Sequence, residues 1–140
     1  MNMLLPIALV ILSNCFYNVI TKQTPGNVNA FLSLGVTYTV AAAFSFIVFF
    51  AGSANTTLSV ELKKLNWTSF ALGIVIVGLE LGYILAYRAG WNVNTAPLVA
   101  NICLAIALVF IGFFAFGETI TAKQIIGMCV CIAGLIIVTI

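Results

Sequence analysis

Glu80 is the acidic residue whose type and position point most directly to chemistry. It lies slightly past the middle of the apolar run from Trp67 to Tyr87. An acidic side chain at that depth in a membrane costs about 2.5–3.5 kcal/mol, so it is rare unless it faces a partner, a cavity or a transport path. Because a low-dielectric medium favours a neutral carboxyl, Glu80 is a candidate for proton exchange or substrate binding. The alternative is a neutral Glu80 that hydrogen-bonds to another helix and holds a dimer together.

Aromatic and small residues surround Glu80 at helical spacing. Tyr83 and Tyr87 follow it at i+3 and i+7, so the three share one face. Rings beside a carboxylate could receive an organic cation by charge and cation–π attraction, whereas Tyr87 is also suited to an interfacial anchor. Gly78 and Gly82 form a small-xxx-small motif around Glu80, which allows another helix to approach closely.

Amide side chains form a second polar set. Asn14, Asn18 and Lys22 repeat every four residues in the first apolar run, Tyr17 is adjacent to that face, and Asn101 lies in the fourth run. Amides inside a bilayer need partners, so the face of the first run that carries Asn14 and Asn18 is expected to point into a helix bundle. Cavity lining and plain interhelical hydrogen bonding are equally open interpretations, and Lys22 has the further option of snorkelling to the headgroups.

Near the C-terminus, Gly127, Cys131 and Gly134 form a small-residue face at i, i+4 and i+7. Close helix packing is the natural use of such a face, and a dimer contact is one version of it. Cys129 and Cys131 point about 200° apart on a helix, which disfavours a shared metal or a disulfide. Since the sequence has no His and no paired acid or nucleophile arrangement, we expect neither an enzyme nor a cofactor, apart from coupling to H⁺.

The composition indicates the solvent in which these residues work. The chain has 140 residues, of which 64% are hydrophobic and 6% charged, whereas soluble domains carry roughly 25% charged residues. So much apolar surface cannot be covered by polar groups, and lipid is the solvent that fits. The net charge of +2 comes from eight ionic groups and favours no nucleic-acid partner.

The hydrophobic pattern predicts an all-α fold, an integral membrane bundle of five transmembrane helices in a single domain over residues 1–140. A helical span needs about 20 mostly apolar residues. The stretches that qualify are 4–21, 30–51, 67–87, 96–116 and 122–140. Residues 56–66 form the longest polar connection and are predicted to contain a short interfacial helix. Thr121 and Gln124 have the spacing of a capping box that opens the last span.

The basic residues give little orientation bias. With five spans, one face receives Lys63, Lys64 and Lys123, and the other receives Lys22 and Arg88. Orientation follows the Lys/Arg bias of short loops, and three against two is close to none. Either the chain has a weak preference for a cytoplasmic N-terminus, or it has dual topology, inserting both ways and pairing antiparallel.

Residues 116–120 (FGETI), 124–127 (QIIG) and 132–134 (IAG) resemble the closing signature of the drug/metabolite transporter superfamily. The EamA-type repeat of that superfamily has five spans, and full-length members carry two such repeats in inverted orientation, whereas this chain has one. The resemblance implies that two copies assemble. Antiparallel pairing would recreate the full-length architecture.

The first and last spans are also similar to those of the four-span small multidrug resistance proteins. Residues 11–22 resemble the stretch that holds the membrane glutamate of that family. This sequence differs by having Asn14 at the glutamate position and by having an additional span, so the resemblance does not carry that family's proton-coupled export mechanism to this chain. Glu80 is a candidate for the same purpose from the third span.

These observations predict a small-solute transporter that acts as an antiparallel homodimer in the lipid bilayer, in a bacterial or archaeal cytoplasmic membrane. Its site is expected at the midplane between protomers. The expected work is alternating-access export of a small organic or amphipathic metabolite, with a cation as the first substrate class considered. The rivals are a lipid-linked sugar or lipid translocator, which needs a lateral opening between helices, and a non-transporting accessory subunit, which needs no water-accessible cavity around Glu80.

Overall fold

The computed structural model describes residues 4–52 and 57–139, and these residues form helices joined by short turns. The predicted all-α fold class is confirmed, and each of the five long apolar helices begins and ends within one residue of its predicted bounds where those bounds are described. Ile140, where the last predicted span ends, lies outside the described residues. The helices are α1 (Leu4–Lys22), α2 (Ala30–Gly52), α3 (Leu58–Leu62), α4 (Trp67–Arg88), α5 (Ala96–Phe116) and α6 (Ala122–Thr139).

Four of these helices, α1, α2, α4 and α5, are long and apolar enough to cross a membrane. The last helix, α6, is shorter, and its apolar segment covers Ala122–Val138. At 1.5 Å per residue this segment covers roughly 25 Å, slightly less than a hydrocarbon core about 30 Å thick. The five-span count and the single membrane domain therefore stay predictions, whereas four spanning-length helices are established.

Side-chain caps set the starts of α2 and α6. The Asn29 Oδ1 accepts hydrogen bonds from the backbone N–H groups of Phe31 at 2.9 Å and Leu32 at 3.2 Å, which satisfies two of the donors left unpaired in a first helical turn. Before α6, the Thr121 N–H donates to Gln124 Oε1 at 2.8 Å and the Gln124 N–H donates to Thr121 Oγ1 at 3.3 Å. This reciprocal pair confirms the predicted capping box.

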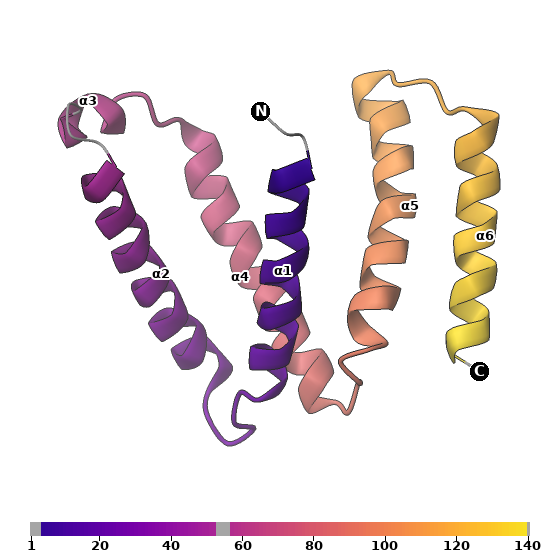
Figure 1. Ribbon diagram of the computed structural model, residues 1–140, viewed down its shortest axis with the longest axis horizontal. Coiled ribbons are helices and arrows are strands. Elements are labelled where there is room, and N and C mark those ends of the chain that lie inside the picture. The colour runs from indigo at the N-terminus through magenta and orange to yellow at the C-terminus, as the bar shows by residue number, and fades with distance from the viewer. Residues whose placement is uncertain (1–3, 53–56, 140) are drawn as a thin grey trace. The chain divides into compact units, whose positions relative to one another are not determined.

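The chain divides into two compact units, one of which is Gln23–Arg88. In this unit α2 and α4 lie side by side and α3 belongs to the connection between them (Figure 1), so the helix predicted in the polar connection is confirmed. A small apolar core holds the pair together. It consists of Ala30, Leu34 and Ile84, with Tyr38, Val77 and Leu81 packed against it.

The end of this unit opposite α3 is closed by Arg88. Its Nη2 donates to the backbone carbonyls of Pro25 at 3.1 Å and Val28 at 2.6 Å. These two bonds fasten the last residue of α4 to the turn that precedes α2. The Arg88 guanidinium thus bonds to backbone carbonyls of a neighbouring turn, an arrangement that suits a basic residue at a membrane–water interface.

The other unit contains Met1–Lys22 and Ala89–Ile140, of which α5 and α6 lie side by side (Figure 1). The Lys22 Nζ donates to the backbone carbonyl of Trp91 at 2.7 Å, which ties the end of α1 to the connection before α5. The end of α1 and the start of α5 therefore lie at the same end of this unit.

Large apolar side chains point outward along the described helices. Leu4 and Phe114 are each 80% exposed and Ile137 is 78% exposed. In water such surface would be covered by further folding or association, because apolar groups in contact with water are costly. In a bilayer the same side chains would contact apolar lipid tails, so their exposure agrees with the high hydrophobic content of the sequence.

We expect Gly117→Ala to destabilise the protein by about 1 kcal/mol, since Gly117 ends α5 in the left-handed region, where a Cβ is strained. Its φ is 67°, and the Glu118 N–H beside it donates to the Gly112 carbonyl at 3.0 Å. Gly26→Ala is the matched control, because Gly26 has no positive φ and open space around it. Thermal unfolding in detergent should show a lower midpoint for the first variant only, and equal midpoints would contradict this role of Gly117.

Candidate functional site

Glu80 lies on the side of α4 that faces α2. Its neighbours Val77 and Leu81 pack against the apolar core of this unit, and the carboxyl is close enough to Tyr38 of α2 to interact with it electrostatically. Glu80 is half-buried. Glu80 on α4 and Tyr38 on α2 therefore both lie between two apolar helices of spanning length.

Glu80 and Tyr38 have few polar partners within the protein. Among the described residues the Glu80 carboxyl makes no hydrogen bond or ion pair, and the buried Tyr38 hydroxyl has no hydrogen-bond partner there either. The ion pair found in the described chain joins Lys64 to Glu61 at 2.6 Å, in the connection between α2 and α4. A carboxyl with no cation beside it in apolar surroundings is suited to take up and release a proton.

Tyr83 and Tyr87 continue the Glu80 face along α4, as predicted from their spacing. Tyr83 is half-buried, and Tyr87 is 5% exposed. Their ring centroids lie 6.1 Å apart with a 31° angle between the planes. The role of Tyr87 as an interfacial anchor stays a prediction, because its burial is set by packing within the protein.

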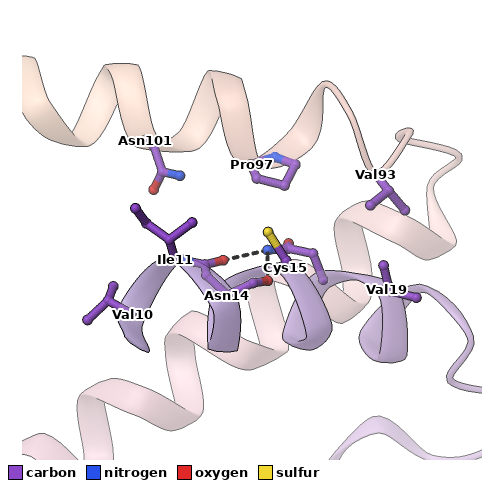
Figure 2. A pocket seen from close by; sticks show the side chains of 9 residues that line it. Val10, Ile11, Asn14, Cys15, Val19, Val93, Pro97 and Asn101 are labelled. Atoms are coloured by element: carbon purple, nitrogen blue, oxygen red, sulfur yellow. Dashed lines mark hydrogen bonds between the residues drawn. The ribbon is translucent and has the colours of Figure 1, made fainter. Parts of the chain in front are cut away.

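The structure brings Asn14, Asn18 and Asn101 together at one pocket, which we call the three-asparagine pocket (Figure 2). Its volume is about 440 Å³, and α1, α5 and the connection before α5 contribute to it. Cavity lining, one of the two interpretations of these amides, is thereby supported. Tyr17 and Lys22 do not line the pocket. The lining residues are Val10, Ile11, Asn14, Cys15, Asn18, Val19, Val93, Pro97 and Asn101.

Asn14 and Asn18 also bond to each other along α1. The Asn18 Nδ2 donates to the Asn14 backbone carbonyl at 2.8 Å and to the Asn14 Oδ1 at 2.6 Å. Asn18 is 5% exposed, whereas Asn14 and Asn101 are exposed toward the pocket. These bonds fix the orientation of the Asn14 amide.

The small-residue faces are open in the described chain. A Cβ added at Gly78, Gly82, Gly127 or Gly134 would meet no described atom within 4 Å, and Cys131 is exposed. Close packing of these faces therefore does not take place within either unit. A contact with a second copy stays a prediction.

Glu118 and Gly112 form a local contact at the end of α5. A Cβ at Gly112 would lie 2.5 Å from the Glu118 Oε2, so the carboxylate lies directly over the glycine. Glu118, Gln124 and four further residues line a second pocket of about 180 Å³. The position of Glu118 at the end of α5 is that of a residue that caps a helix end.

Sequence reasoning missed Tyr38 and Gly112. A hydroxyl in the interior of the second apolar run was a signal for Tyr38, because a polar group at that depth needs a partner. For Gly112 there was none, since the need for a glycine arises from the way Glu118 folds back. No group of three or more His, Cys, Asp or Glu side chains in the described residues could hold a metal ion.

The long apolar helices and the outward-facing apolar side chains define the class of protein: they are typical of a multi-pass membrane protein. Comparison of the chain with family models, with curated proteins and with solved structures finds no match. The resemblance to the EamA-type repeat and to the small multidrug resistance proteins therefore stays a prediction from the quoted motifs.

Proposed function

We propose that this protein is a small-solute transporter in which Glu80 is the coupling carboxyl. One observation carries the proposal: Glu80 lies at mid-span between α2 and α4 with no cation, hydrogen bond or ion pair to it among the described residues. A purely structural carboxyl at that depth would be expected to bond to its neighbours, because an unsatisfied polar group in lipid is costly. A group that exchanges a proton during a transport cycle must instead stay available to it.

The proposed assembly is an antiparallel homodimer with α6 as the fifth span, which is the arrangement implied by the resemblance to half of an inverted-repeat transporter. The open face at Gly127 and Gly134 supports it, since small residues let helices of two copies approach closely. Two Glu80 side chains, one from each protomer, would then face a shared cavity. Neither an enzymatic activity nor a cofactor is part of the proposal, and the membrane proposed is the cytoplasmic membrane of a bacterium or archaeon.

The function is tested by reconstituting the purified protein in vesicles that contain a pH-sensitive dye. Metabolites are first screened by thermal shift, because a bound ligand stabilises by mass action. Each stabilising compound is then imposed as a gradient across the vesicle membrane. We expect at least one of them to drive proton movement above that in protein-free vesicles. Stabilisation without any flux of solute or protons would contradict the proposal and favour an accessory subunit.

We expect dual topology, because the basic residues are distributed three against two across the two faces. In a variant without the native cysteines, Ser59→Cys and Asn94→Cys place single thiols at exposed positions beyond opposite ends of α4. A membrane-impermeant maleimide applied to whole cells should label about half of the molecules at each position. Full labelling at one position and none at the other would end the antiparallel model.

A further inference from the structure

The three-asparagine pocket contains amides but no charged side chain. Its other lining residues are apolar or weakly polar, and Lys22, the nearest cation along α1, donates to the Trp91 carbonyl instead. A volume of about 440 Å³ falls in the range of roughly 300–1,000 Å³ found for small-molecule sites. Charge attraction therefore plays no part in what this pocket selects.

Two amides are presented to the pocket from facing helices. Figure 2 shows the Asn101 side chain directed from α5 toward α1, where Asn14 lies. The Asn14 Oδ1 accepts a hydrogen bond from Asn18. The Nδ2 of Asn14, on the opposite side of the amide, points away from Asn18 and has its donors available. No described residue hydrogen-bonds to the Asn101 side chain. An amide offers both donors and an acceptor, so the pair suits a ligand with complementary amide or hydroxyl groups.

The apolar and amide residues of the pocket occupy different positions along α1 and α5. Lys22 and Trp91 mark the end of this unit at which α1 stops and α5 starts. Val93 and Pro97 lie near that end, Asn101 lies about 8 Å farther along α5 than its start, and Asn14 lies about 12 Å from Lys22 along α1. A ligand entering from this end would pass Val93 and Pro97 before it meets Asn101 on α5, and the buried Asn18 before it meets Asn14 on α1.

We infer that the three-asparagine pocket binds an uncharged small molecule that carries an amide or hydroxyl group on an apolar body. The inference deepens the proposed function by naming the class of the solute, and it rests on that proposal for the step from ligand to transported solute. The Asn14 Nδ2 and the Asn101 amide, set among apolar side chains, gain most from a neutral partner, whereas a charged ligand would lose its hydration without meeting an opposite charge. The solute class inferred from the pocket is therefore uncharged, in place of the cation predicted from the sequence.

Three probes of nearly equal shape test the selectivity: 4-fluorobenzamide, 4-fluorobenzamidinium and 4-fluorobenzoate, which are neutral, cationic and anionic. Each is titrated by ¹⁹F NMR against the full-length protein in nanodiscs of zwitterionic lipid, with protein-free nanodiscs as the blank for partitioning. We expect saturable binding of the benzamide and binding of the two ions at least about tenfold weaker. Equal or tighter binding of either ion would overturn the inference.

Variants locate the binding. Asn101→Leu and Asn14→Leu each remove an amide while keeping the branched shape of the side chain, and each should weaken the benzamide by about two- to tenfold, the loss of one hydrogen bond. Asn94→Leu, the same change at an exposed position outside the lining, should leave the affinity unchanged. Ile11→Trp keeps every amide but fills the pocket, and it should abolish saturable binding. Unchanged affinity in Asn101→Leu and Ile11→Trp would overturn the assignment.

The outcomes separate this inference from the proposed function. Saturable binding without solute flux in vesicles would end the transport proposal and leave the ligand site standing. Solute flux that is insensitive to Asn101→Leu, Asn14→Leu and Ile11→Trp would end the inference and leave the transport proposal standing. If the asparagine variants changed the oligomeric state and no probe bound, a helix of a second copy would be the occupant, which also overturns the inference.

Discussion

Glu80→Gln is expected to reduce proton-coupled transport in vesicles to the level of protein-free vesicles while the protein stays folded. Glutamine keeps the shape and the hydrogen-bonding capacity of the side chain but cannot gain or lose a proton in this range of pH. Because the Glu80 carboxyl makes no ion pair or hydrogen bond within the described chain, its replacement breaks none there. The substitution therefore separates the chemistry of the carboxyl from its structural effect.

The measurement is substrate-driven proton movement, parent against variant, with folding checked by gel filtration. Glu61→Gln is the matched control, since Glu61 pairs with Lys64 in the short α3 outside the long helices and should leave transport unchanged. In the parent the coupled rate should pass through a maximum with pH. At low pH the carboxyl would stay protonated throughout the cycle, and at high pH it would stay ionised. Normal coupled transport by Glu80→Gln would leave Glu80 without the proposed role.

Gly134→Leu is expected to raise the dimer dissociation constant at least tenfold, which corresponds to about 1.4 kcal/mol or more. A leucine side chain on the small-residue face of α6 would prevent the close approach of a second helix. Within the protomer the same change should be harmless, because a Cβ at Gly134 meets no described atom within 4 Å. Leucine also has a better helix propensity than glycine, by somewhat under 1 kcal/mol, so the monomer should not lose stability.

Dissociation is followed by dilution in detergent with energy transfer between two fluorescent labels. Ala133→Leu is the control, since Ala133 is also exposed on α6 but points about 100° away from Gly134. A dimer as tight in Gly134→Leu as in the parent would show that lipid, rather than a second copy, covers this face. Equal weakening by both variants would also contradict a contact specific to the small residues.

The sequence by itself determined the helices of this protein. Each predicted apolar run became a helix whose described ends lie within one residue of the predicted bounds, because helical hydrogen bonds are local and a segment in lipid has to satisfy all of them internally. The capping box at Thr121 and Gln124 was equally predictable, since its partners are three residues apart. The helical face shared by Glu80 and Tyr83 also followed from spacing alone.

The tertiary structure alone decided which polar residues meet. Asn101 shares a pocket with Asn14 and Asn18 rather than contributing to another site, and Tyr38 is the side chain that accompanies Glu80. Helix pairing in a membrane depends on side-chain fit between segments far apart in the sequence, because lipid gives no hydrophobic force that favours one pairing over another. Periodicity assigns each residue to a face of its own helix, and only the packing of those helices decides what that face meets.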